Sequence, residues 1–445
     1  MHALQIINIV ITILIMGCYA YQFFVFIPVS LIGRGRRRKK AETEVVPDPR
    51  SFAVLISARN EENVIGDLID SIKAQDYTLG PVTTIVVADN CTDRTADIAR
   101  EHGAVVYTRF NDKLIGKGYA LDELFGHLRE DYPEGFDAYL IFDADNILST
   151  NYITEMNKTL SEGFDVALGY RNGKNYGDNW ISAGYSHWFL RDNRYLNYPR
   201  YKVGSSCVVA GTGFAFTRKV EDELGGWPFH MLTEDTEFTA YYVTSGRKIG
   251  YSPYAEFYDE QPRKFSQSWK QRLRWARGSL QVFRKYGGKM VKGWFKYGFS
   301  CFDLSMSIIP AYFLTLAAVF FNFTLGIVTA IRGEDVLGVL SSFGTLLSNL
   351  MGAVFIMGIF TTITEWKHIH TSVPKKILYL ITFPFFMATY IPIVIASLFY
   401  KPKWTPITHS VTMSSLQDKK NSGLGDLVKS GENTNSQSDA YEPNG

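Results

Sequence analysis

Two carboxylates of one short motif could hold a metal ion. Asp143 and Asp145 stand on either side of Ala144, directly after the apolar run Tyr139–Phe142. Mg²⁺ and Mn²⁺ take oxygen ligands, and Mg²⁺ usually binds through one or two carboxylates together with substrate phosphates. The pair is therefore a candidate site for Mg²⁺ or Mn²⁺ bound to a diphosphate. The same residues are also compatible with an ordinary solvated turn after a strand.

A second acidic motif could move a proton. Glu234 and Asp235 follow Thr233 and open a helical pattern that places Phe238 and Tyr242 on one side. A carboxylate at such a position can accept the proton of an attacking hydroxyl group, which is the role of a general base. Helix capping is the competing interpretation, because threonine followed by acidic residues is a favourable helix start. On the motif alone, helix capping is the favoured interpretation.

Residues 265–286 combine an apolar stripe with basic flanks. The flanking charges are Lys270, Arg272, Arg277 and Arg284. This pattern predicts a helix lying at a membrane surface. Within it, Gln271, Arg274 and Trp275 are candidates for binding, because arginine makes bidentate contacts to phosphate and tryptophan offers a flat face to a sugar ring.

Short apolar runs alternate with helical patterns from residue 50 onward. The runs that predict strands are Phe52–Ser57, Thr84–Ala88, Ala104–Thr108, Ala138–Phe142 and Val166–Tyr170. Between the first two, residues 64–72 form one helical face. Such alternation predicts a doubly wound, mostly parallel α/β sheet, in which ligands bind beyond the carboxyl ends of the strands. Polar residues follow three of these strands, at 58–62, 89–93 and 143–145.

Four apolar runs are each long enough to cross a bilayer, which takes about 20 residues. One covers about residues 4–32, and three lie between residues 301 and 400. We therefore expect one N-terminal and about three C-terminal transmembrane helices. The first run lacks the basic start and the cleavage site of a secretory signal, so it is predicted to be a retained anchor.

The predicted organisation follows the chain in order. It comprises an N-terminal anchor (1–33), a basic linker (34–49), a globular catalytic domain (50–264), interfacial amphipathic helices (265–298), transmembrane helices (299–400) and a disordered tail (401–445). The basic residues between Arg34 and Lys40 place the linker and the domain in the cytosol by the positive-inside rule. The tail is rich in Ser, Asn, Asp, Gly and Lys and has too few apolar residues to fold.

The overall charge and the cysteines argue against other classes of protein. The formal net charge of +2 gives no support to a nucleic-acid partner. The four cysteines lie too far apart for a zinc knuckle and imply no disulfide framework. The sequence also offers no convincing Ser-His-Asp or Cys-His arrangement for covalent catalysis.

The order of these motifs resembles that of the family 2 processive glycosyltransferases, the group that includes cellulose, chitin and hyaluronan synthases and the poly-N-acetylglucosamine synthases. The motifs are Ala58-Arg59-Asn60-Glu61, Asp89, Asp143-Ala144-Asp145, Thr233-Glu234-Asp235 and Gln271-Arg272-Leu273-Arg274-Trp275, followed by membrane helices. The similarity covers about residues 50–300 in motif and the remainder in layout. A lone Asp-x-Asp is unspecific, whereas Thr-Glu-Asp followed by Gln-x-x-Arg-Trp at this distance is specific.

The resemblance implies a GT-A-like domain that transfers N-acetylglucosamine or glucose from a UDP-sugar, with inversion and a divalent metal, to a growing β-linked polysaccharide. By resemblance, the donor site comprises Glu61, Asp89, Lys117, Asp143, Asp145, Gln271 and Arg274, the catalytic residues are Asp235 and Glu234, and the acceptor site contains Trp275 and Gly213. Asp235 is then the base, and Asp143 and Asp145 hold the diphosphate and its Mg²⁺ or Mn²⁺.

The layout departs from that of the larger synthases, which surround a channel for their product with more helices. An accessory secretion or synthase subunit is therefore a candidate partner. Transfer of a single sugar to a membrane lipid is the alternative function, and a non-catalytic binding protein is disfavoured because no key carboxylate is lost. The expected location is the cell membrane. Four spans would leave the tail outside the cell, whereas Lys401 and Lys403 favour the cytosol.

Overall fold

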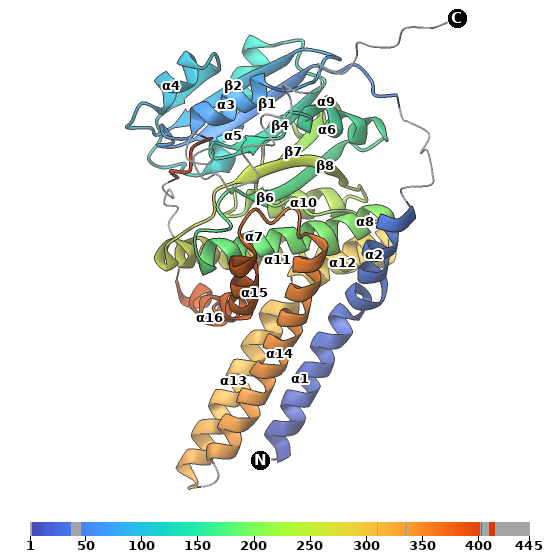
Figure 1. Ribbon diagram of the computed structural model, residues 1–445, viewed down its shortest axis with the longest axis vertical. Coiled ribbons are helices and arrows are strands. Elements are labelled where there is room, and N and C mark those ends of the chain that lie inside the picture. The colour runs from blue at the N-terminus through green and yellow to red at the C-terminus, as the bar shows by residue number, and fades with distance from the viewer. Residues whose placement is uncertain are drawn as a thin grey trace, which may run out of the picture.

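The computed structural model describes residues 2–36, 46–308, 310–333, 336–400, 402 and 409–413. A globular domain stands at one end of the molecule and a group of long helices at the other (Figure 1). Residues 37–45 of the basic linker and most of the predicted tail lie outside the described residues.

An eight-stranded sheet forms the centre of the globular domain, in the order β3-β2-β1-β4-β7-β6-β8-β5. Its strands are β1 (Phe52–Ala58), β2 (Val82–Asp89), β3 (Val105–Arg109), β4 (Ala138–Asp143), β5 (Ile147–Leu148), β6 (Val166–Gly173), β7 (Phe214–Thr217) and β8 (Gly250–Asp259). The first four strands are parallel, as predicted, so their carboxyl ends meet at one edge. β7 runs antiparallel to β4 and β6, which makes the second half of the sheet mixed.

Helices cover both faces of the parallel half because its strands are apolar on both sides. Phe52, Val54 and Ile56 of β1 pack into one core, whereas Ala53 and Leu55 pack into another on the opposite face. The helices of this domain are α3 (Ile65–Lys73), α4 (Thr95–Glu101), α5 (Lys117–Asp131), α6 (Tyr152–Ser161), α7 (Trp180–Asp192), η2 (Asn193–Asn197), α8 (Tyr198–Lys202), α9 (Arg218–Leu224) and α10 (Glu234–Thr244).

The remaining elements are all helical. They are α1 (His2–Tyr21), η1 (Gln22–Phe26), α2 (Ile27–Arg36), α11 (Phe265–Tyr297), α12 (Phe299–Ile308), α13 (Pro310–Ile331), α14 (Val336–Thr364), α15 (Val373–Ala388) and α16 (Tyr390–Phe399). Four segments are long and apolar enough to cross a membrane, one near the N-terminus and three after the globular domain, as the sequence predicts.

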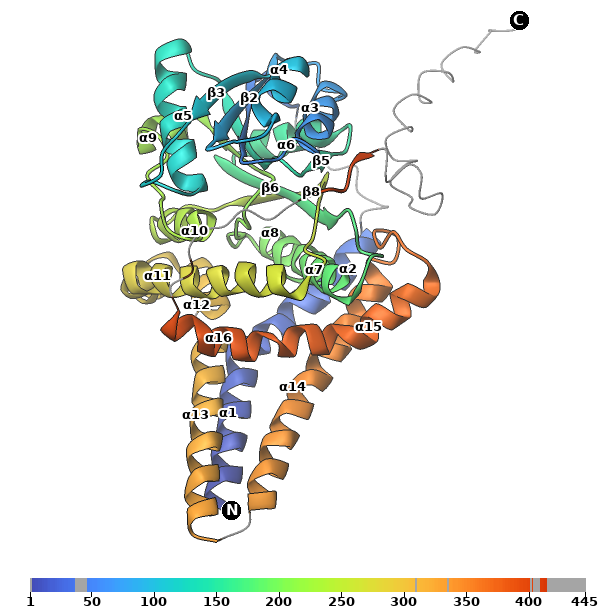
Figure 2. The same ribbon diagram turned by 90° about the vertical axis from the view of Figure 1, so that its left-hand side faces the viewer.

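Polar contacts hold three of the long helices together. α1, α13 and α14 run side by side away from the globular domain in both views (Figures 1 and 2). Asn8 Nδ2 donates to Asn322 Oδ1 at 3.1 Å and lies 2.9 Å from Ser342 Oγ, so one amide joins all three helices. Such hydrogen bonds favour helix association in apolar surroundings.

A single helix, α11, carries the Gln271–Trp275 motif below the sheet, where several interfacial helices were expected (Figure 2). The prediction that Arg272 belongs to an exposed basic flank is wrong. Its side chain is completely buried, donates to Thr389 Oγ1 at 2.7 Å and lies over the ring of Phe386. Arg272 therefore connects α11 to the junction of α15 and α16.

Candidate active site

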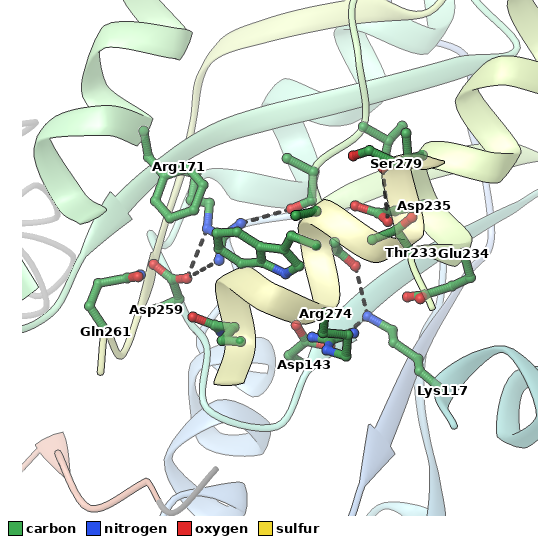
Figure 3. A pocket seen from close by; sticks show the side chains of 18 of the residues that line it. Lys117, Asp143, Arg171, Thr233, Glu234, Asp235, Asp259, Gln261, Arg274 and Ser279 are labelled. Carbon is green, nitrogen blue, oxygen red and sulfur yellow. Dashed lines mark hydrogen bonds and ion pairs between the residues drawn. The ribbon is translucent and has the colours of Figure 1, made fainter. Parts of the chain in front are cut away.

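One cavity of about 840 Å³ lies where the carboxyl ends of β1, β2 and β4 face α10 and α11 (Figure 3). Of the residues selected from the sequence, those lining it are Glu61, Asp89, Lys117, Asp143, Asp145, Glu234, Asp235, Gln271, Arg274 and Trp275. Motifs that are far apart in the chain therefore face one space, at the edge where a doubly wound sheet binds its ligands.

Two asparagines turn the chain sharply after β1 and at the end of β2. Asn60 and Asn90 have φ angles of 58° and 53°, a left-handed conformation that asparagine tolerates better than most residues. The side chain of Asn60 accepts a hydrogen bond from the backbone amide of Thr92 at 2.8 Å, which ties the two loops together. These turns place Glu61 and Asp89 at the cavity.

An arginine that was not selected from the sequence orients Asp89. Arg109 Nη1 lies 2.6 Å from Asp89 Oδ1, and Arg109 Nε contacts Glu123 Oε2 at 2.8 Å. Burial raises the pKa of the Asp89 carboxyl, and the guanidinium of Arg109 acts against that effect. The ion pair therefore presents Asp89 to the cavity in one orientation.

The Asp143 and Asp145 side chains reach the cavity because Ala144, between them, is buried in the core. Asp143 Oδ1 lies 2.5 Å from Lys117 Nζ, and the same ammonium donates to the carbonyl of Gly211 at 2.7 Å. Asp145 is only 5% exposed, and its Oδ2 accepts the backbone amide of Glu260 at 2.8 Å.

These two carboxylates fit a divalent cation that a diphosphate helps to hold. Burial acts to raise the pKa of Asp145, but the nearby cations His409 and Lys174 outweigh burial and hold that pKa below its usual range. Asp145 is therefore available as an anionic oxygen donor. In the part of the chain that the structure describes, no three His, Cys, Asp or Glu side chains group closely enough to bind a metal by themselves. Phosphate oxygens would have to complete the coordination.

The helix-capping interpretation of the second acidic motif does not account for its threonine. Thr233 precedes α10, yet its side chain makes no capping hydrogen bond, and its Oγ1 has no partner among the described residues. Thr233 instead packs closely against α11 at Gly278, where an added Cβ would come within 2.4 Å of Thr233 Oγ1. Glycine at position 278 thus allows α10 and α11 to approach each other.

Glu234 and Asp235 form an adjacent acidic pair near Lys117 and Arg274. Burial, reinforced by the charge of Asp235, raises the pKa of Glu234 to about 7, and burial also raises the pKa of Asp235. Arg274 is anchored beside them, because its Nη1 donates to the carbonyl of Leu232 at 2.9 Å. Glu234 therefore titrates near neutral pH and Asp235 above its usual range, which suits a carboxylate that accepts a proton as a general base.

The raised pKa values predict an acid limit on the reaction. The base must be unprotonated, and burial raises the pKa of Asp235 above its usual range, so the turnover rate should fall at acid pH and rise to a plateau as Asp235 ionises. Glu234→Gln removes the acid whose pKa is about 7 and leaves Asp235 in place, so the variant should keep an acid limb. A pH–rate profile of both proteins checks this, and disappearance of the acid limb in the variant would contradict Asp235 as the base.

Trp275 lies among residues that were not selected from the sequence. Its ring meets that of Tyr185 edge-on, with the ring centres 5.7 Å apart. Arg171 and Asp259 line the same cavity and form an ion pair, with Arg171 Nε 2.8 Å from Asp259 Oδ2 (Figure 3). The guanidinium of Arg171 also lies 3.7 Å from the centre of the Phe189 ring. The sequence did contain a signal for Asp259, the polar run 259–261 just ahead of the helix that carries Trp275.

Gly213 was predicted to bind the acceptor together with Trp275. Trp275 lines the cavity, but Gly213 does not. Its φ is +66°, and a Cβ there would lie 2.1 Å from the ring of Phe257, so packing alone requires glycine. Gly211 lines the cavity instead, and a Cβ added there would lie 4.0 Å from Asp235 Oδ2. Within the loosely matching loop 209–213, the earlier glycine therefore faces the reacting groups.

Part of the predicted disordered tail lies against the cavity, so the prediction is wrong for residues 409–413. His409 Nδ1 lies 2.9 Å from Glu61 Oε1. The backbone amides of Ser410 and Val411 both donate to Glu260 Oε2, at 2.8 and 2.7 Å. The amino-acid composition of the tail could not reveal this contact. The segment is held by backbone amides, which every sequence has, and by a single imidazole.

The charge of His409 follows from its surroundings. Burial alone would lower the pKa of its imidazole, but Asp145, Glu61 and Glu260 together raise that pKa to about 10. Burial also raises the pKa of Glu61 to about 7, and His409 acts against that effect. At neutral pH the protonated imidazole is therefore a positive charge among three carboxylates of the cavity.

The mixed sheet and the carboxylates at its strand ends define a GT-A-like glycosyltransferase domain. The chain belongs to the family described as glycosyltransferase like family 2, whose sequence model matches residues 49–278, more than half of the chain. The fold is shared with a mannosyltransferase from Pyrobaculum calidifontis, solved with GDP-Man and Mn²⁺, at a TM-score of 0.51 and 16% identity over 89% of this chain and 99% of that one.

Curated relatives include enzymes with different acceptors. The chain is 27% identical over 256 residues to a probable glycosyltransferase, YdaM, of Bacillus subtilis, covering 54% of this chain and 58% of that protein. It is 26% identical to a beta-monoglucosyldiacylglycerol synthase of Synechocystis, covering 62% and 57%. It is 24% identical to a poly-beta-1,6-N-acetyl-D-glucosamine synthase of Staphylococcus aureus, covering 61% and 65%. The matches span less than two thirds of these relatives.

Proposed function

We propose that this chain transfers a sugar from a UDP-sugar, N-acetylglucosamine or glucose, to a growing β-linked saccharide at the membrane. The observation that carries the proposal is that Asp143, Asp145, Asp235 and Trp275 all line one cavity. Asp143 and Asp145 serve the donor diphosphate, Asp235 serves the acceptor hydroxyl group, and Trp275 stacks on the acceptor sugar.

The proposed reaction is a single inverting displacement. The acceptor oxygen attacks the anomeric carbon from the side opposite the diphosphate, and Asp235 accepts the hydroxyl proton. The bond between that carbon and the diphosphate oxygen breaks, and its electron pair leaves with UDP. An α-linked donor thus becomes a β-linked product without a covalent intermediate on the enzyme.

The chain's own cations hold the leaving group. Arg274 is fixed by its bond to the Leu232 carbonyl, and Lys117 is fixed between Asp143 and the Gly211 carbonyl. Such preorganised charges stabilise a leaving diphosphate without reorganisation during the reaction. A bound Mg²⁺ or Mn²⁺ supplies further neutralisation of the diphosphate charge. Glu61 and Asp89, at the ends of the two loops, are proposed to bind the uridine.

Transfer of one sugar to a membrane lipid is the second candidate, and a specific observation favours it. The cavity is continuous from the carboxylates to side chains of α13 and α16, where Tyr312, Ile391 and Val394 line it. An acceptor could therefore reach Asp235 from the apolar side. Under both candidates the catalytic domain is proposed to face the cytosol at the cell membrane, and an accessory subunit is proposed where a polymer is exported.

The two candidates differ in their products. Membranes that contain the chain are incubated with UDP-sugars labelled in the sugar, one at a time, and the product is separated by solvent extraction and sized. A labelled polymer from UDP-N-acetylglucosamine or UDP-glucose supports the first proposal. A labelled monoglycosyl lipid selects the second. No transfer from any UDP-sugar, with transfer from another nucleotide sugar, contradicts the proposed donor.

Trp275→Ala should shorten the product more than it weakens donor binding. Loss of an aromatic stack of about 0.5–1.5 kcal/mol corresponds to an acceptor affinity about 2–12-fold lower, so chains should be released earlier. Product length on a sizing gel and the Kd for UDP are the measurements. Trp269→Ala is the matched control, because Trp269 lies on the same helix but does not line the cavity. Unchanged product length would contradict an acceptor role.

A further inference from the structure

The fourth apolar segment, α15 and α16, has the composition of a membrane span but a different direction. It covers Val373–Phe399, 27 residues with a mean hydropathy of 1.9. Whereas α1, α13 and α14 run away from the globular domain, α15 and α16 lie across them, with α16 directly below α11 (Figure 2). The composition of this segment therefore predicts a membrane crossing, whereas its direction in the structure does not.

The beginning of the segment is bound to the globular domain. Lys375 Nζ donates to the carbonyl of Gly177, between β6 and α7, at 2.6 Å. Just ahead of α15, the carbonyl of His368 accepts a hydrogen bond from Asn172 of β6 at 2.9 Å. The chain has thus returned to the level of the catalytic domain when α15 begins.

The middle and the end of the segment contact the same side. Arg272 of α11 donates to the carbonyl of Phe386 at 3.2 Å and to Thr389 Oγ1 at 2.7 Å. Arg277, also on α11, donates to the carbonyl of Ser397 at 3.0 Å. Beyond the segment, His409 pairs with Glu61 in the catalytic cavity.

These contacts are incompatible with a crossing. A straight helix of this length would be about 40 Å long at 1.5 Å per residue, and would separate its ends by more than the roughly 30 Å of the hydrocarbon core. Its midpoint, near Phe386, would lie at the bilayer centre together with the guanidinium of Arg272, where a charged side chain is strongly disfavoured.

The two faces of α15 differ in the way that an interfacial helix requires. Lys376, Tyr379, Phe383 and Phe386 are buried toward the protein. The opposite face exposes large apolar side chains: Ile377, Leu378, Ile381 and Phe385 on α15, continued by Leu398 and Phe399 on α16. An apolar face of this kind, continuous with membrane-crossing helices, is suited to acyl chains.

We propose that α15 and α16 lie in the membrane surface with this apolar face against lipid acyl chains, and that only α1, α13 and α14 cross the bilayer. Three crossings put the C-terminal segment on the same side as the catalytic domain, which is where His409 is found. Four crossings would have left the basic segment after the last apolar run outside the cell. With three crossings, that segment lies in the cytosol, as its lysines favour. The inference does not depend on the sugar or the acceptor.

Depth in the bilayer tests the proposal directly. Phe385→Cys and Phe320→Cys, in the full-length chain in vesicles, each receive a spin label. Both positions are exposed phenylalanines near the middle of an apolar segment, so they are matched. The label at 385 is expected near the headgroups, with the label at 320 close to the bilayer centre. Equal depth near the centre would overturn the proposal.

Topology gives a second, independent readout. Ser436→Cys places a thiol in the tail, and Arg332→Cys places one after α13, between the two crossing helices α13 and α14. A membrane-impermeant maleimide is applied to intact and to permeabilised cells, with the unmodified chain as the blank. Position 332 is expected to react in intact cells, and position 436 only after permeabilisation. Reaction of position 436 in intact cells would overturn the proposal, and folding of both variants is verified by retained sugar transfer.

Discussion

Asp235→Asn is expected to lower the turnover number by about 10²–10⁴-fold, the usual contribution of a general base, and to leave the Kd for UDP nearly unchanged. Asp235 lies at the start of α10, and a Cβ added at Gly211 would lie 4.0 Å from its Oδ2. An amide at this position keeps the size of the side chain but cannot accept the proton of the acceptor hydroxyl. Single-turnover transfer and UDP titration by calorimetry separate the two effects.

A control variant distinguishes this loss from a general effect of removing an acid. Asp97→Asn changes an exposed aspartate on α4, whose side chain is 66% exposed and far from the cavity lining. It should transfer sugar at the normal rate. Near-normal turnover of Asp235→Asn would remove this residue as the base and leave Glu234 as the candidate.

Removal of the metal or of its ligands should abolish transfer. Asp143→Asn and Asp145→Asn each replace an anionic oxygen donor by a neutral amide, and a chelator should have the same effect on the unmodified chain. If the metal contributes about 3 kcal/mol to the transition state, the rate falls by more than about 10²-fold. Activity of the unmodified chain should return on addition of Mg²⁺ or Mn²⁺.

Metal binding can be followed apart from catalysis. Electron paramagnetic resonance of Mn²⁺ in the presence of UDP should show a bound ion in the unmodified chain and a weaker one in both variants. Asp112→Asn serves as the control, because Asp112 is exposed and does not line the cavity. Full activity after chelation, or unchanged Mn²⁺ binding in the variants, would refute the assignment of Asp143 and Asp145.

Much of the fold follows from local patterns. The strands β1 to β4 and β6 occur within a few residues of the apolar runs that predict them, and α3 occurs where residues 64–72 form one apolar face. β5, β7 and β8 escaped prediction, because β5 and β7 have only two and four residues and β8 mixes apolar with polar side chains. The pairing of β7 and β8 with β4 and β6 depends on contacts between distant segments, which no local period encodes.

The candidate site was predictable to the extent that strand order places polar residues at one edge. Glu61, Asp89, Asp143 and Asp145 each follow or end an apolar run, so the parallel sheet brings them together. Arg171 and His409 were not predictable in this way. Arg171 lies within a strand of the mixed half, and His409 lies in a polar segment that contacts the cavity only after the chain has passed through α11 to α16.

The sequence alone determined which residues are candidates for the chemistry, because carboxylates after apolar strands and a Gln-x-x-Arg-Trp motif on an amphipathic helix are local properties of the chain. It also determined which segments are apolar enough to enter a membrane. Only the tertiary structure decided what each apolar segment contacts. Hydropathy measures the preference of a segment for an apolar environment, but the direction of α15 and α16 depends on Arg272, Arg277 and Gly177 of the catalytic side, to which the segment is hydrogen-bonded.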